Sequence, residues 1–167
     1  MPIAHTSALH TPYWQQPHLG RLLGYALQRF DQRVISLMAR DIDVPLALSN
    51  LAARGQVSAA HIHITRHLPP EGARLSELAQ QAHMSKQAMN DLVDQCEAWG
   101  IVIRTMDARD RRARMIQYTE SGLLWLQAFT RAVTQAEAEF KEEVGTEIAT
   151  VIQIGLEAYA SGFEQAV

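Results

Sequence analysis

Apolar residues recur every three or four positions along most of this chain, which is the spacing of one face of an α-helix. The first such run covers 19–38 and is interrupted at 41–45. Shorter runs predict helices over about 45–54 and 58–67, and the proline pair at 69–70 ends the second of them.

The middle of the chain changes from a helical pattern to an alternating one. A short helix is predicted over about 75–83, and Ser85 can cap a longer helix that ends at Gly100. Residues 101–105 then alternate with a period of two, and 115–118 supply a matching run. Two helices joined by a short turn and followed at once by a β-hairpin predict a winged helix-turn-helix.

Helical spacing returns after the hairpin and continues to the end of the chain. Thr119 can cap a long helix that Gly145 ends, and Thr146 can cap a last helix that reaches about Phe163. The predicted fold class is therefore mainly α with a small β-hairpin (α+β). The first helix and the last two carry more apolar positions than one internal face needs, so pairing with a second copy is expected.

Charge is unevenly distributed, although the formal net charge is only −3. Five of the fifteen basic residues fall within 104–114, in and beside the predicted hairpin loop. Residues 120–167 hold two basic and eight acidic residues. A basic loop beside a helix-turn-helix suits contact with a phosphate backbone, whereas the alternative is an ordinary solvated loop.

Composition limits the remaining classes of protein. No apolar stretch approaches the roughly 20 residues that cross a bilayer, and the N-terminal 18 residues do not have the pattern of a secretory signal. The single cysteine, Cys96, excludes an intramolecular disulfide framework and fits a cytoplasmic location. No nucleophile elbow, phosphate-cradling glycine loop or convincing metal cluster is present, so neither an enzyme nor a cofactor is predicted.

The segment "LSELAQQAHMSKQAMNDLVDQCEAWGIVIRTMDARDRRARMIQYTESG" resembles the DNA-binding core of the MarR family of bacterial transcriptional regulators. Asp110-Arg111-Arg112 is similar to the D-x-R turn of the family's wing. Thr119 through Gly122 is similar to the T-x-x-G that begins the following helix.

This resemblance implies a winged helix-turn-helix joined to a helical dimerisation domain that both chain ends form. It implies a homodimer that binds a palindromic site on double-stranded DNA, usually as a repressor that a small organic effector or an oxidant releases. The corresponding regions are an N-terminal arm (1–18), a dimerisation helix with a connecting short helix (19–57), the DNA-binding domain (58–118) and the C-terminal dimerisation helices (119–167). No membrane partner is expected.

Two groups of residues are candidates for contact with DNA. Polar side chains near the start of the second helix suit base edges and phosphates, and arginines suit a narrow groove. These candidates are Ser85, Lys86, Gln87, Asn90, Arg109, Arg111, Arg112 and Arg114. By analogy with the family, Arg112 is the first choice for minor-groove entry. Asp107 and Asp110 are expected to shape the wing by pairing with its arginines.

Two further features leave alternatives open. His61, His63 and His67 lie on one predicted helix, where they are surface or packing residues, part of an organic-ligand pocket (His63 and His67), or, least expected, a metal site. Cys96 occupies a core-facing position, which favours a buried apolar role over a thiol-based redox sensor. The competing function for the whole chain is a winged-helix adaptor that binds protein, which the basic hairpin disfavours.

Overall fold

The computed structural model describes residues 16–107, 110 and 113–164, and the side chains at 59, 60, 63 and 162–164 lie outside that description. The elements in chain order are α1 (Leu19–Met38), α2 (Leu46–Ala53), α3 (Ala59–His67), β1 (Ala73–Arg74), α4 (Leu75–Gln81), α5 (Lys86–Ala98), β2 (Val102–Met106), β3 (Arg114–Tyr118), α6 (Glu120–Val144) and α7 (Thr146–Glu164). The predicted fold class is confirmed: helices dominate, and the strands form one small antiparallel sheet.

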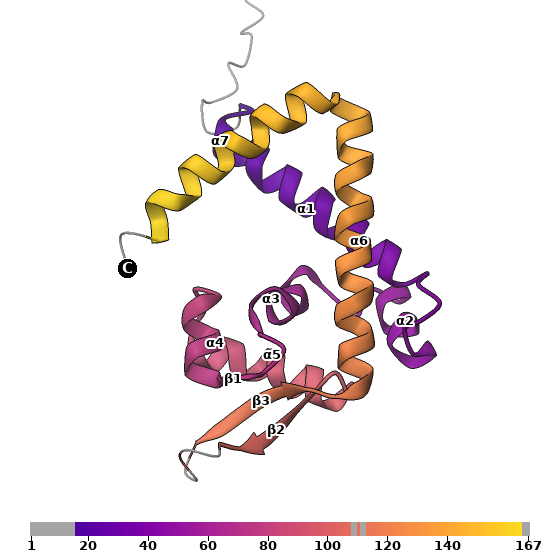
Figure 1. Cartoon of the computed structure of the whole chain (residues 1–167), viewed down its shortest axis with the longest axis vertical. Helices are drawn as coiled ribbons and strands as arrows, with labels where there is room; N and C mark the ends of the chain where they lie inside the picture. Colours follow the sequence, from indigo (N-terminus) through magenta and orange to yellow (C-terminus); the bar gives the residue numbers. More distant parts are fainter. Residues whose placement is uncertain (1–15, 108–109, 111–112, 165–167) are drawn as a thin grey trace, which may run out of the picture.

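Two regions make up the molecule (Figure 1). The winged lobe contains α3, α4, α5 and the sheet, and α6 rises from it as a long helix. The helical ends, α7 and the first turns of α1, lie at the far end of α6 from the sheet. None of the described helices is long and apolar enough to cross a membrane.

The predicted hairpin is part of a three-stranded sheet in the order β1-β3-β2. Strand β3 pairs with β2 in the register Arg104 to Ile116, and with β1 in the register Ala73 to Ile116. The sequence pattern missed β1 because a strand of two residues has no visible alternation. Gly72, just before β1, has a φ of +89°, and a Cβ there would lie 2.7 Å from the Ile116 carbonyl oxygen, so only glycine fits this approach.

Helix boundaries follow the caps that the sequence suggested, with one correction. The Thr119 side chain caps α6 by accepting a hydrogen bond from the Gly122 N–H at 3.0 Å, and Gly100 has a left-handed φ of +73° after α5. The prediction that Thr146 caps α7 is wrong, because Thr146 is the first residue of that helix. Its carbonyl instead accepts a hydrogen bond from the Thr150 hydroxyl. Gly145, with a φ of +89°, separates the two helices.

The core of the winged lobe is contiguous and apolar. Its most deeply buried side chains, each at most 1% exposed, are Ile62, Ile64, Leu78, Met89, Val93, Val102 and Ile116. Helix α6 joins this core through Trp125, whose indole N–H donates to the Thr65 hydroxyl of α3 at 3.2 Å. The start of the long helix is therefore fixed to the lobe.

Candidate nucleic-acid interface

The N-terminal turn of α5 is exposed and capped. Ser85 accepts a hydrogen bond from the Ala88 N–H at 3.1 Å, and Lys86 and Gln87 are exposed beside it. The opposite face of α5 is buried through Met89, Leu92, Val93 and Cys96. The helix therefore presents one polar turn to solvent, with free backbone N–H groups that favour an anion.

His61 of α3 packs against α5 and its C-terminal end. The Ser58 N–H donates to His61 Nδ1 at 3.0 Å, so Nε2 carries the ring proton and donates to Gln95 Oε1 at 2.7 Å. The ring also packs against Trp99, with centroids 4.6 Å apart, and His61 is only 8% exposed. These contacts make His61 a packing residue between α3 and α5.

The role of His63 and His67 of α3 in an organic-ligand pocket stays a prediction. His67 is half-buried, and the side chain of His63 lies outside the described residues. Over 16–107, 110 and 113–164, no group of three or more His, Cys, Asp or Glu side chains gathers in a way that would hold a metal ion.

The wing is closed by backbone contacts at the base of its loop. The Asp107 N–H donates to the Ala113 carbonyl, and the Ala113 N–H donates to the Asp110 carbonyl at 2.9 Å. Arg114 is exposed at the start of β3, and Asp110 is exposed in the loop. The predicted contact residues Arg109, Arg111 and Arg112 lie outside the described residues.

Asp107 has a described partner beyond the wing. Its carboxylate accepts a hydrogen bond from Arg74 Nε at 2.7 Å, and the carboxylate raises the pKa of the Arg74 guanidinium by this hydrogen bond and by its charge. Asp107 is only 7% exposed, so this ion pair fixes the base of the wing to the β1–α4 junction. No pattern in the sequence indicated Arg74, which stands 33 residues earlier.

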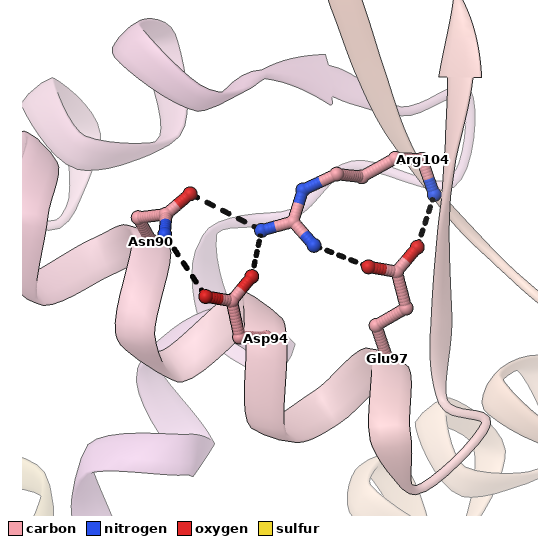
Figure 2. A network of polar contacts seen from close by, with 4 residues as sticks. All are labelled: Asn90, Asp94, Glu97 and Arg104. Carbon is pink, nitrogen blue, oxygen red and sulfur yellow. Dashed lines mark hydrogen bonds and ion pairs between the residues drawn. The ribbon is translucent and has the colours of Figure 1, made fainter.

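Asn90 takes part in a polar cluster with β2. Its side-chain oxygen accepts from Arg104, and its amide group donates to Asp94 (Figure 2). One signal could have placed these three residues together, since Asn90, Asp94 and Glu97 recur at the spacing of one helical face. Which basic residue faces them was not visible in the sequence.

Comparison with known proteins agrees with this geometry. Residues 62–113, from α3 to the wing loop, match a protein-family model described as the MarR family. The resemblance to the MarR family is confirmed.

Solved structures of MarR-family and related regulators share the fold of the chain. The transcriptional repressor CouR bound to a 23-mer DNA duplex is 21% identical, with a TM-score of 0.65 over 86% of this chain and 92% of that one. Wild-type apo MarR from E. coli is 16% identical, with a TM-score of 0.62 over 84% and 96%. A MarR-family regulator from Rhodococcus sp. RHA1 is 20% identical, with a TM-score of 0.57 over 87% and 96%.

The single cysteine of the winged lobe lies in an environment that disfavours a reactive thiol. Cys96 is 2% exposed, and burial raises the pKa of its thiol to about 12. A redox-sensing thiol needs access to solvent and a lowered pKa. The buried apolar role is therefore the interpretation that the geometry favours.

Proposed function

We propose that this chain is a homodimeric, sequence-specific DNA-binding transcriptional regulator that acts as a repressor in the bacterial cytoplasm. The observation that carries the proposal is the exposed, capped first turn of α5 next to a basic wing, within a MarR-family winged helix. The DNA-bound CouR structure, which shares the fold, supports the same role for this lobe.

Each part of the interface has a distinct task in this proposal. Lys86, Gln87 and the N-terminal backbone of α5 contact the major groove, where glutamine suits an adenine edge and lysine suits phosphate. Arg114 and the loop arginines follow the neighbouring phosphates and the minor groove. These assignments extend the sequence prediction and await measurement.

Dimerisation through the helical ends supplies the second half of the interface. The exposed apolar side chains there include Leu19 and Leu22 of α1, and Ile148, Val151, Ile152 and Tyr159 of α7. The four on α7 share one face at helical spacing. A second copy would cover them by two-fold symmetry and place two α5 helices on a palindromic site.

Release by a small organic effector completes the proposal. A recess of about 250 Å³ lies beside α1 and α6, with Leu37, Arg40 and Gln135 in its wall. This volume is below the roughly 300 Å³ at which ligand pockets usually begin, so the first ligands to test are small. An effector would weaken the affinity for DNA by the same factor by which DNA weakens the affinity for the effector.

The decisive experiment selects binding sites from a random library of 30-base-pair duplexes. We expect a palindromic consensus, and a binding constant that falls steeply with salt as counterions are released. Arg112→Ala is expected to weaken binding to the selected duplex by about tenfold, without loss of the dimer. Lys141→Ala, at the far end of α6, is the matched control.

Two results would contradict this proposal. Failure to enrich any sequence, together with capture of a protein by the wing, would favour the adaptor function. A monomer at micromolar concentration would contradict the two-fold arrangement.

A further inference from the structure

Arg104 connects the wing to the recognition helix through three residues on successive turns of α5 (Figure 2). Its Nη2 donates to Asn90 Oδ1 at 3.2 Å and to Asp94 Oδ1 at 2.5 Å, and its Nη1 donates to Glu97 Oε2. Its backbone N–H also donates to Glu97 Oε1 at 3.0 Å. Strand β2 is thus bound to α5 by its side chain and by its backbone.

This arrangement depends on the shape of the arginine guanidinium. A planar guanidinium offers several N–H donors in fixed directions, whereas a lysine ammonium is a compact point charge. Here the fork serves three acceptors at once, and the Arg104 side chain is only 23% exposed. An exposed ion pair contributes little, but a network in fixed geometry holds its elements more firmly.

The cluster also reduces the negative charge on the surface of α5. Lys86 is the only basic residue of this helix, which also carries the acidic residues Asp91, Asp94 and Glu97. Carboxylates beside a phosphate backbone repel it. Arg104 places one positive charge between two of the three carboxylates, so less negative charge faces the DNA.

We propose that Arg104 is a positioning residue that sets the angle and distance of the wing relative to the recognition helix, with Asn90 as part of this clamp and not a base-reading residue. Both ends of the Asn90 amide are already engaged, the oxygen by Arg104 and the nitrogen by Asp94 at 3.0 Å. The inference rests on the proposed function, because the clamp orients groups that must contact DNA.

The test is a mutant cycle measured on a selected duplex and on a scrambled duplex of the same composition. Its members are the wild-type protein, Arg104→Gln, Asp94→Asn/Glu97→Gln, and the combined variant. A positioning role predicts that the ratio of selected to scrambled affinity falls about tenfold in Arg104→Gln, with an unchanged salt slope. The ratio should also fall in Asp94→Asn/Glu97→Gln, and the combined loss should be smaller than the product of the two.

A direct phosphate contact predicts a different set of results. Arg104→Gln would then reduce the salt slope by about one for each subunit and weaken both duplexes by the same factor. Asp94→Asn/Glu97→Gln would tighten binding to both duplexes and leave their ratio unchanged, since it only removes negative charge. This set would overturn the inference and leave the proposed function intact.

Two further variants separate the clamp from simple charge and from base reading. Arg104→Lys should fail to restore the affinity ratio, because one ammonium cannot serve three acceptors; full restoration overturns the inference. Asn90→Ala should leave the selected consensus unchanged, whereas Gln87→Ala should relax it at one position. A consensus altered by Asn90→Ala overturns the role given to Asn90. A wild-type protein that enriches no sequence overturns both proposals together.

Discussion

The winged lobe buries its large apolar side chains, whereas the helical ends expose many of theirs. In the lobe, Leu78, Met89 and Val93 are fully buried within one chain. At the ends, Leu19 is 72% exposed, Val151 is 70% exposed and Tyr159 is 82% exposed. The lobe completes its own core, whereas the ends display a surface that a partner would cover.

The contact between α1 and α6 joins the helical ends to the rest of the chain. Arg29 donates two hydrogen bonds to Glu143, and Arg33 donates two to Glu139. Arg131 of α6 binds Asp41 just beyond α1. Val34 and Met38 of α1 and Ala132 and Ala136 of α6 are also buried in one apolar cluster. The joint therefore combines polar pairs with apolar packing, and the exposed apolar side chains of α7 and of the start of α1 lie outside it. This difference supports the proposal that the winged lobe folds as a complete unit, whereas the helical ends need a second copy to cover them.

Introducing charge on the outer face of α7 should have the largest effect. Val151→Glu combined with Tyr159→Glu would place two carboxylates where we propose that a second chain packs. Sedimentation at micromolar concentration should then change from dimer to monomer. Affinity for the selected duplex should fall by more than about 100-fold, because the two half-sites would no longer be bound together.

A matched control for this variant is Thr150→Glu. Thr150 is also exposed on α7, but it lies away from the stripe that contains Val151 and Tyr159. It should leave both the dimer and DNA affinity close to wild type. An equal loss of the dimer and of DNA affinity in Thr150→Glu would mean that added charge anywhere on α7 has this effect, whichever face carries it.

The next largest effect is expected inside the lobe, at Gly122. A Cβ at this position would lie 1.9 Å from the Ile101 carbonyl oxygen, a backbone atom that cannot move without shifting the turn after α5. Gly122→Ala should therefore cost about 3 kcal/mol or more and lower the melting temperature by roughly 6–12 °C. Gly24→Ala is the control, since a Cβ there meets nothing within 4 Å. Equal melting temperatures for the two variants would mean that the close approach at Gly122 does not limit stability.

Gly122 also shows which features a sequence can reveal. Thr119 and Gly122 were visible as a motif, and Ser85 and Gly100 as the ends of a helix, because caps depend on local backbone geometry. The Cβ clash that requires Gly122 was not visible, since it involves a backbone atom 21 residues earlier. The motif located the site, and the fold supplies its physical reason.

The partners of charged side chains were the least predictable part of the site. Asp107 binds Arg74 outside the wing, which no sequence pattern indicated, and its expected pairing with the wing arginines stays a prediction. Asn90 was expected to contact DNA, and in the structure its side chain accepts a hydrogen bond from Arg104. A pattern gives the face on which a residue lies, but the choice among several arginines depends on tertiary packing.

Removing the hydroxyl of Thr119 should have a moderate effect. This hydroxyl donates to the Gly100 carbonyl at 2.5 Å while its oxygen accepts from the Gly122 N–H, so it links α6 to the turn after α5. Thr119→Val should lower the free energy of unfolding by about 1 kcal/mol, the usual cost of a lost cap. Thr130→Val is the control, because the Thr130 hydroxyl only donates to Leu126 of its own helix. Urea denaturation of both variants measures the difference.

The smallest effect is expected at the half-buried ion pair between Arg33 of α1 and Glu139 of α6. The hydrogen bond from Arg33, assisted by Gln135, lowers the pKa of Glu139 from 4.5 to about 2. A carboxyl whose pKa is lower in the folded protein stabilises it above pH of about 4.5, and this stabilisation is lost as the pH falls towards 2. Glu139→Gln should therefore reduce the loss of unfolding free energy between these two pH values.

The matched comparison for this pair is Glu137→Gln on the same helix. Glu137 is exposed and makes no ion pair within the described part of the chain. Urea denaturation at several pH values between 2 and 7 should give Glu137→Gln the acid sensitivity of the wild type, and Glu139→Gln a weaker one. Identical curves for all three proteins would mean that the Arg33–Glu139 pair adds nothing to the joint between α1 and α6. The apolar packing of the two helices would then hold that joint alone.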